Sequence, residues 1–379
     1  MRLQTRSAHR ARKERKRPLV NVKPSTSALS WLRRTILHPD LVQSIAAVLI
    51  ALLIGALLIQ LLGKDALAAY RALLEGAAGN LNSLAETLLK AIPLTLAGVG
   101  VTIAFRANVF NVGAEGQLFC GAMLSAWVGL LLGDQPWYIV IPAMMLAAML
   151  AGALWAAIAG VLKTALGASE LINTIMLNYI AIFFIGYLLH GPLQDPNSPL
   201  GQTARLAEAA RLPRILEGTR LHGGIFIALA VVVIASILLW RTVWGFQIRA
   251  AGHNAEAARA AGINTSWVIL SSLMLSGALA GLAGFAEVAG VQRRMIENIS
   301  PGYGYTAIVV ALLGRTNPPA VFIAAILFAG LQVGASTMES AVGVPSSIAT
   351  IIQYLIVLLI MGRGTFSFLQ RLMTKGKSV

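Results

Sequence analysis

Charged side chains are scarce in this 379-residue chain: Asp, Glu, Lys and Arg together make up 12% of it. In a typical soluble domain these four residue types make up about a quarter of the chain. Hydrophobic residues make up 57%, which leaves too few polar side chains to cover soluble cores in a chain of this length. The sequence also contains a single cysteine, Cys120, which excludes an intrachain disulfide and argues against a cysteine-based metal cluster. These scarcities exclude the soluble class and favour a membrane protein.

Long uncharged runs take the place of the missing charges. Several of them reach the roughly 20 residues that a helix needs to cross the hydrocarbon core of a bilayer. The sequence therefore predicts an all-α, polytopic membrane protein with about ten transmembrane helices in a membrane domain at 40–362. The run at 303–314 is too short to span alone. The predicted spans lie at about 41–63, 84–105, 117–133, 136–162, 171–190, 223–240, 266–286, 303–314, 317–338 and 346–362.

The net charge of +15 is concentrated in a basic N-terminal tail. Residues 1–39 contain eleven Lys and Arg against one acid, and a second tail, 363–379, contains four and no acid. Basic residues beside a span are typical of the cytoplasmic side. With an even number of spans, both termini are predicted to be cytoplasmic, the polar loop 191–222 extracytoplasmic and the loop 241–265 cytoplasmic. The first tail lacks interleaved aromatic residues apart from Trp31, so no nucleic-acid partner is expected.

Polar residues interrupt the apolar pattern at residues 105–117, whose sequence is FRANVFNVGAEGQ. Two glycines, two asparagines, Arg106 and Glu115 lie there between two predicted spans. Backbone that leaves helical geometry at membrane depth must line a cavity or be buried in protein. The segment is therefore either a broken helix beside a transport path or a tight cytoplasmic turn. A loosely similar interruption at 293–305 suggests an internal repeat with interrupted helices in both halves.

A polar stripe marks the start of the predicted span 171–190. At about 100° per residue, Glu170, Asn173, Thr174 and Asn178 fall within an arc of about 140°. Polar side chains on a membrane helix face the bundle interior or water rather than lipid. The stripe could contact a transported solute or form interhelical hydrogen bonds, and the pattern leaves both interpretations open.

The predicted cytoplasmic loop contains helix signals over residues 254–262. Asn254 is a favourable N-cap, Glu256 suits the first turn, and Gly262 suits the C′ position. The alanines between them favour a two-turn helix with a face of small side chains outside the membrane. Such a helix is either a docking element for another protein or an inert connection.

The chain resembles a known protein family at four segments, which lie at 105–117, 169–181, 245–264 and 299–317. Together they are similar to the permease subunit of bacterial ABC importers for ribose, branched-chain amino acids and nucleosides. FRANVFNVGAEGQ and ELINTIMLNYIA most resemble the larger permease of the nucleoside-type systems. The resemblance covers roughly residues 41–362. It implies a bacterial inner-membrane protein that pairs with a second permease subunit, an ABC ATPase subunit and an extracytoplasmic solute-binding lipoprotein, with 245–264 as the coupling helix on the ATPase.

Two sets of functional residues follow from this interpretation. Polar side chains in apolar stretches are expected to line the solute path, because hydroxyl groups and base edges need hydrogen-bond partners. Ala257, Ala258 and Ala261 are expected to form the contact face for the ATPase, with two arginines beside it. The expected solute-path residues are Asn111, Glu115, Asn173, Asn178 and Tyr303. The expected coupling residues are Gly245, Arg249, Gly252, Asn254, Ala257, Ala258, Arg259 and Gly262.

The chain contains no ATP-binding motif of its own. Its Gly-Lys-Ser at 376–378 lacks the upstream glycine of a P-loop. ATP hydrolysis is therefore expected on a separate subunit, and the chain is expected to be neither an enzyme nor the holder of a cofactor or metal. The alternative function is an ion-coupled secondary transporter or channel for a small polar solute. Six predicted spans lack any charge, which argues against proton coupling but not sodium coupling. The preferred solute is a nucleoside, with a simple sugar second.

Overall fold

The computed structural model describes residues 39–361, and its regular elements are helices, accompanied by two isolated β-bridges. The all-α prediction is confirmed. Within this range each predicted apolar run contains a helix. These helices are α3 (Pro39–Leu61), α5 (Leu81–Arg106), α6 (Ala114–Leu131), α7 (Trp137–Leu166), α8 (Glu170–Leu189), α9 (Gly224–Arg241), α12 (Thr265–Ala286), α13 (Tyr303–Leu313), α14 (Pro318–Val342) and α15 (Ser347–Met361).

Seven of the described helices are long and apolar enough to cross a membrane by length and composition, namely α5 to α9, α14, and α12 together with the turn that follows it. The apolar stretches 46–61, 303–313 and 347–356 are shorter. The basic tails predicted at 1–39 and 363–379 lie outside the described residues, apart from Pro39. The remaining elements are α4 (Ala66–Ala78), α10 (Val243–His253), α11 (Ala255–Ala260), the short 3₁₀ turn η1 (Glu208–Ala210) and the π-helix η2 (Glu287–Gln292).

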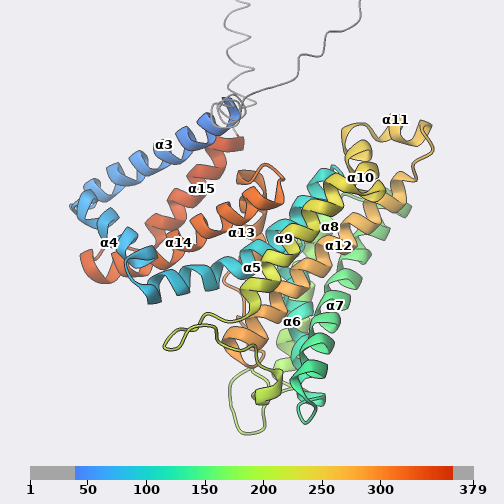
Figure 1. Cartoon of the computed structure of the whole chain (residues 1–379), viewed down its shortest axis with the longest axis horizontal. Coiled ribbons are helices and arrows are strands. Elements are labelled where there is room, and N and C mark those ends of the chain that lie inside the picture. Colours follow the sequence, from blue (N-terminus) through green and yellow to red (C-terminus); the bar gives the residue numbers. More distant parts are fainter. Residues whose placement is uncertain (1–38, 362–379) are drawn as a thin grey trace, which may run out of the picture. The chain divides into compact units, whose positions relative to one another are not determined.

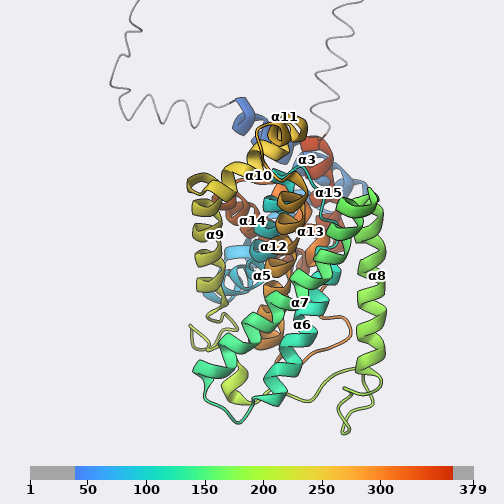
Figure 2. The same cartoon turned by 90° about the vertical axis from the view of Figure 1, so that its right-hand side faces the viewer.

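Residues from Ala47 onward belong to one compact unit, and α5 and α12 form its centre. Helix α12 packs against α5, α6 and α7, while α5 also contacts α9, α13 and α14, as Figures 1 and 2 show. The most apolar stretch of α5 is 83% buried, whereas that of α8 is 22% buried. The central helices are therefore enclosed by protein, and α8 presents most of its surface outward.

Glycines on α12 allow this close packing. A Cβ atom at Gly281 would overlap the backbone oxygen of Ala148 in α7, and one at Gly277 would overlap that of Gly152. Small residues let membrane helices approach until their backbones touch, which strengthens the van der Waals contacts that hold such bundles together. The spaced glycines of this helix are therefore packing positions.

Replacing Gly281 with Ala is expected to lower the stability of the detergent-solubilised protein by about 1–3 kcal/mol, because the added methyl group forces α7 and α12 apart. The thermal midpoint of unfolding measures this effect. Gly186→Ala in α8 is the matched control, since the added atom would lie 3.9 Å from Glu297, an ordinary van der Waals contact. Equal midpoints for the two variants would contradict the packing role.

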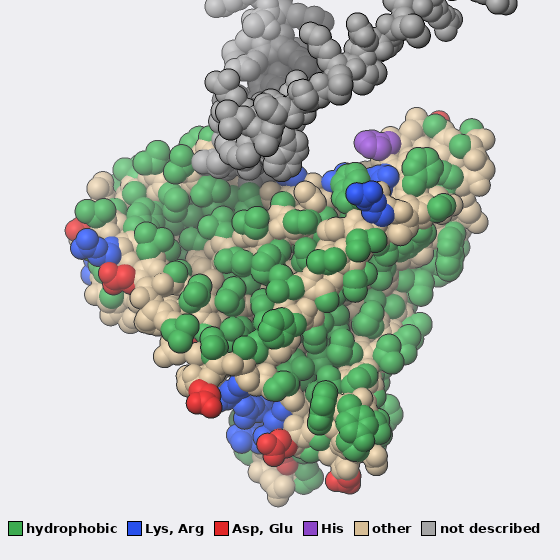
Figure 3. Space-filling view, viewed as in Figure 1, with side chains coloured by type: hydrophobic (Ala, Val, Ile, Leu, Met, Phe, Trp, Pro, Cys, Tyr) green, Lys and Arg blue, Asp and Glu red, His purple; other side chains and the backbone are tan. Residues whose placement is uncertain are grey.

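Large hydrophobic side chains cover the outward faces of the peripheral helices. In α7, Leu146, Leu150 and Leu154 are exposed, and in α8, Phe183 and Tyr187 are exposed. Figure 3 shows hydrophobic side chains across the middle of one face, with most charged side chains towards its edges. An apolar surface of this extent is stable against lipid chains and costly in water. The surface is that of a multi-pass membrane protein.

Candidate transport and coupling sites

The first candidate site surrounds the break between α5 and α6. Asn108, which follows the end of α5, adopts a left-handed φ of 58°. Asn111 is fully buried in this break. Its amide nitrogen lies 2.9 Å from Oε1 of Gln117 and 2.8 Å from Oγ of Ser276, and its oxygen accepts a hydrogen bond from Gly113 N–H at 3.0 Å. Asn111 therefore ties the break to both α6 and α12.

Glu115 joins this break to the second interrupted segment. It lies in the first turn of α6 and is buried. Its Oε2 accepts a hydrogen bond from Gly304 N–H at 2.6 Å. Helix α13 starts there, after Gly302 with a φ of +89°. A carboxylate is favourable at this position, because the first N–H groups of a helix lack partners and carry a partial positive charge. The two interruptions found in the sequence thus meet in space.

Asn178 ties α8 to the same point. Its side-chain oxygen accepts a hydrogen bond from Gly116 N–H at 2.8 Å, and its amide nitrogen donates to the carbonyl of Val112 at 2.9 Å. The same nitrogen lies 3.3 Å from the hydroxyl of Tyr305. The structure therefore shows Asn178 as an interhelical hydrogen-bonding residue, which was one of the two interpretations of the polar stripe.

The expected solute-path residues thus separate into two groups. Asn111, Glu115 and Asn178 meet around the start of α6 and bond to protein groups, and we call these three residues the α6 junction. Tyr303 is buried at the start of α13. Asn173 is partly exposed on α8, and its Nδ2 has no hydrogen-bond partner in the described part of the chain. A role of these five residues in solute passage stays a prediction.

A second polar group lies at the start of α5, where the spacing of Glu86 and Lys90 predicts a pair but Glu86 bonds to Arg220 of the 191–222 loop instead. Arg220 forms two hydrogen bonds with Glu86, at 2.8 and 2.6 Å, and these bonds raise the pKa of Arg220. Glu287, the first residue of η2, is buried, and Lys90 is half-buried. Glu287 directly follows the apolar run 266–286 in the sequence. An ionisable residue in a membrane segment is costly to bury and often functional, so this position could have indicated the site. π-helical turns are likewise frequent at functional sites.

The loop at 241–265 contains the predicted short helix, α11. Oδ1 of Asn254 accepts a hydrogen bond from Ala257 N–H at 3.0 Å, and Gly262 has a φ of +84°. The N-cap and the terminating glycine are confirmed. An additional helix, α10, precedes it and was not predicted; the hydroxyl of Thr242 caps it by accepting from Gly245 N–H at 3.0 Å.

The three alanines predicted to form one contact face do not all face outward. Ala258 is 4% exposed and packs in the core of the chain, whereas Ala257 and Ala261 are exposed. A contact of Ala258 with a partner stays a prediction, and in the described structure this side chain packs against its own chain. The reason is that one side of the α11 turn must cover the protein beneath it, while the opposite side faces outward. Arg259 is also exposed, and its Nε lies 3.3 Å from Oγ1 of Thr265.

Helix α10 fixes the loop to the bundle. A Cβ atom at Gly252 would overlap the backbone oxygen of Arg106 at the end of α5, and one at Gly245 would overlap that of Leu238 in α9. The guanidinium groups of Arg249 and Arg106 lie 4.9 and 5.0 Å from the centre of the Trp240 ring. Glycine contacts and cation–π contacts therefore connect the loop to α5 and α9.

Comparison with known proteins assigns the family. The sequence profile of the branched-chain amino acid transport system permease component matches residues 83–361. The chain belongs to this family. No solved structure is significantly similar to it.

Three relatives are similar over most of their length. A glucose ABC transporter permease protein of Haloferax volcanii is 39% identical over 324 residues, 83% of this chain and 85% of the relative. A guanosine ABC transporter permease protein of Bacillus subtilis is 36% identical over 334 residues, 87% and 96% of the two chains. A nucleoside ABC transporter permease protein of Lactococcus lactis is 32% identical over 323 residues, 83% and 88%. The chain is thus a permease subunit of an ABC transporter, and this supports the importer over the ion-coupled alternative.

Proposed function

We propose that the chain moves a nucleoside inward across the membrane as the permease of an ATP-driven importer. The observation that carries the proposal is the similarity, over nearly the full length of each relative, to permeases named for guanosine and for nucleosides. A simple sugar is the second candidate, because the relative from Haloferax volcanii is named for glucose.

Uptake of radiolabelled guanosine and glucose tests this proposal. Cells that lack the gene should lose high-affinity guanosine uptake, and plasmid-borne wild-type protein should restore it. An excess of unlabelled glucose of about a hundredfold should leave guanosine uptake unchanged. Restored glucose uptake without guanosine uptake would favour the sugar instead.

The proposal also assigns the partners. Hydrolysis of ATP would take place on a separate ATPase subunit that contacts the outward side of α11, and an extracytoplasmic binding lipoprotein would deliver the solute. A second permease subunit would complete the pathway. Deleting the ATPase gene should abolish uptake, whereas a protonophore should leave it intact while ATP is maintained. The opposite result would favour an ion-coupled transporter.

Cysteine labelling should place the 191–222 loop outside the cell and the 241–265 loop in the cytoplasm, which is the orientation that puts both termini in the cytoplasm. With Cys120 replaced by Ala, a cysteine introduced at the exposed Asn197 of the 191–222 loop is expected to react with an impermeant thiol reagent in intact cells. A cysteine at the exposed Ala261 of the coupling loop is expected to react after permeabilisation alone. Labelling of intact cells at Ala261 and not at Asn197 would reverse the orientation.

A further inference from the structure

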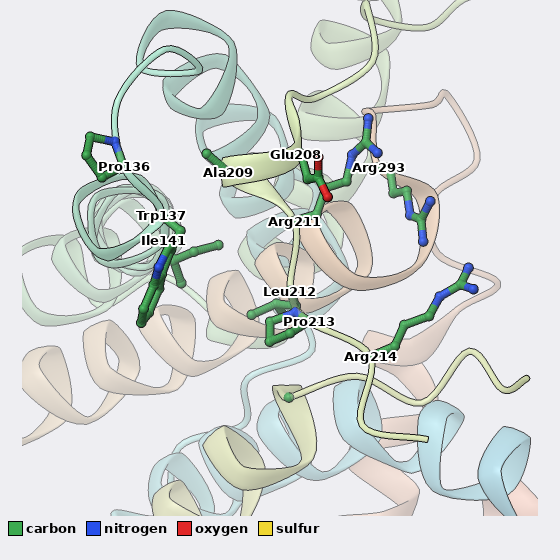
Figure 4. A pocket seen from close by; sticks show the side chains of 11 residues that line it. Pro136, Trp137, Ile141, Glu208, Ala209, Arg211, Leu212, Pro213, Arg214 and Arg293 are labelled. Atoms are coloured by element: carbon green, nitrogen blue, oxygen red, sulfur yellow. The ribbon is translucent and has the colours of Figure 1, made fainter. Parts of the chain in front are cut away.

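A cavity of about 1000 Å³ opens where the start of α7 meets the 191–222 loop and the end of η2. Its two walls differ in chemistry. Figure 4 shows the apolar side chains of Trp137 and Ile141 on one side and the guanidinium groups of Arg214 and Arg293 on the other. Arg211 and Glu208 also line it. The cavity is therefore amphipathic and rich in positive charge.

The positive charges converge on one another. Partial burial, followed by repulsion from Arg214, Arg211 and Arg205, lowers the pKa of Arg293. Arg211 directs its Nε and Nη2 to the carbonyl of Leu206, at 3.0 and 2.7 Å. Among residues 39–361, no ion pair joins a carboxylate to Arg214 or Arg293. Since Glu208 brings one negative charge to a wall with three arginines, the cavity has an excess of positive charge, and an anion would relieve the repulsion.

The backbone holds Arg293 at this wall. Its φ of 58° is left-handed, which is uncommon for a residue with a side chain. Its N–H donates to the carbonyl of Val288 at 2.8 Å, and its own carbonyl accepts from Leu206 N–H at 2.9 Å. Both backbone groups of Arg293 are therefore hydrogen-bonded. These bonds anchor Arg293 to η2 and to the neighbouring loop.

The apolar wall continues onto the lipid-facing surface. Trp137 is 67% exposed and Tyr138 is 62% exposed at the start of α7. Their rings pack edge to face with centres 6.0 Å apart. Exposed aromatic residues at the end of a membrane helix are typical of the membrane–water interface. Deeper along the same helix, Leu146, Leu150 and Leu154 are exposed. A molecule in the cavity could therefore contact arginines and lipid-facing apolar side chains at the same time.

We propose that this cavity binds an anionic phospholipid from the leaflet that the start of α7 faces. Arg214 and Arg293 would contact the phosphate, and Trp137 and Ile141 would contact the glycerol and the first part of an acyl chain. Guanidinium groups suit phosphate because they can donate two parallel hydrogen bonds to it. This site lies at the lipid boundary and is additional to the proposed solute path and to the coupling loop.

The test is lipid retention by the purified full-length protein. After equal exposure to phosphatidylglycerol and phosphatidylcholine in mixed micelles, native mass spectrometry should show preferential retention of phosphatidylglycerol by the wild type. Arg214→Gln combined with Arg293→Gln should reduce this retention about tenfold, through loss of two charge-assisted contacts. Arg214→Lys combined with Arg293→Lys should keep most of it. Arg294→Gln is the matched control, because Arg294 does not line the cavity.

Three outcomes would overturn the proposal. Equal retention of the two lipids by the wild type would show that headgroup charge is not recognised. Complete displacement of phosphatidylglycerol by inorganic phosphate at millimolar concentration would show that the cavity is a small-anion site and not a phospholipid site. Unchanged lipid retention in the Gln variants, together with lost association of the binding lipoprotein, would make the cavity a protein-docking surface. If the double variant is not monodisperse, Arg214→Gln alone gives the same decision.

Discussion

Ala257→Glu is expected to abolish uptake and solute-stimulated ATP hydrolysis while leaving the permease folded in the membrane. Ala257 is exposed on the outward side of α11, which lies in the 241–265 loop. On the proposed function, this side rests against the ATPase. A glutamate there would bury an unpaired charge in the contact, which costs about 3–5 kcal/mol. Uptake, ATPase stimulation and the amount of permease in the membrane are measured together.

Two further variants make this result specific. Ala257→Ser keeps the side chain small and uncharged, so it should retain coupling. Ala258→Glu introduces the same charge one residue later, but inside the core of the chain. It should therefore lower the thermal midpoint of the permease itself, whereas Ala257→Glu should not. Normal coupling in Ala257→Glu would show that α11 is a connection and not a docking element.

The sequence predicted the positions of the membrane helices well, because long uncharged runs reflect a physical requirement of the bilayer. Shorter helices were predicted less well. Helix α4 contains Arg71 and Glu75 and spans 13 residues, so a search for uncharged runs passes over it. Helix α10 has no uncharged run or strong capping pattern that sets it apart from the polar loop, whereas capping residues at both ends of α11 predict that helix.

The candidate sites depended on contacts that local sequence does not reveal. Asn111 and Asn178 were recognised as interior polar residues, but the choice between solute contact and hydrogen bonding depends on partners distant in sequence. Glu86 illustrates this further, because its partner Arg220 lies 134 residues away. The periodic pattern of a helix indicates which face is buried, and tertiary packing decides what that face meets.

The second large expected effect concerns Glu115 in the α6 junction. Glu115→Ala is expected to lower the stability of the permease by about 2 kcal/mol, since it removes a charged acceptor and leaves a buried N–H of α13 without a partner. Uptake, normalised to the amount of permease in the membrane, should fall together with the stability. The thermal midpoint in detergent and guanosine uptake in cells are the two measurements.

Glu115→Gln separates the structural contribution of this residue from a role in transport. The amide oxygen of Gln can still accept from Gly304 N–H, so the fold should be largely preserved, although the negative charge at the start of α13 is lost. If Glu115 acts through the fold alone, uptake should recover in step with the thermal midpoint. If the α6 junction also lies on the solute path, Glu115→Gln should be stable and still transport slowly. Normal uptake by a stable Glu115→Ala protein would exclude both roles, because the contact between the two interrupted segments would then carry neither stability nor transport.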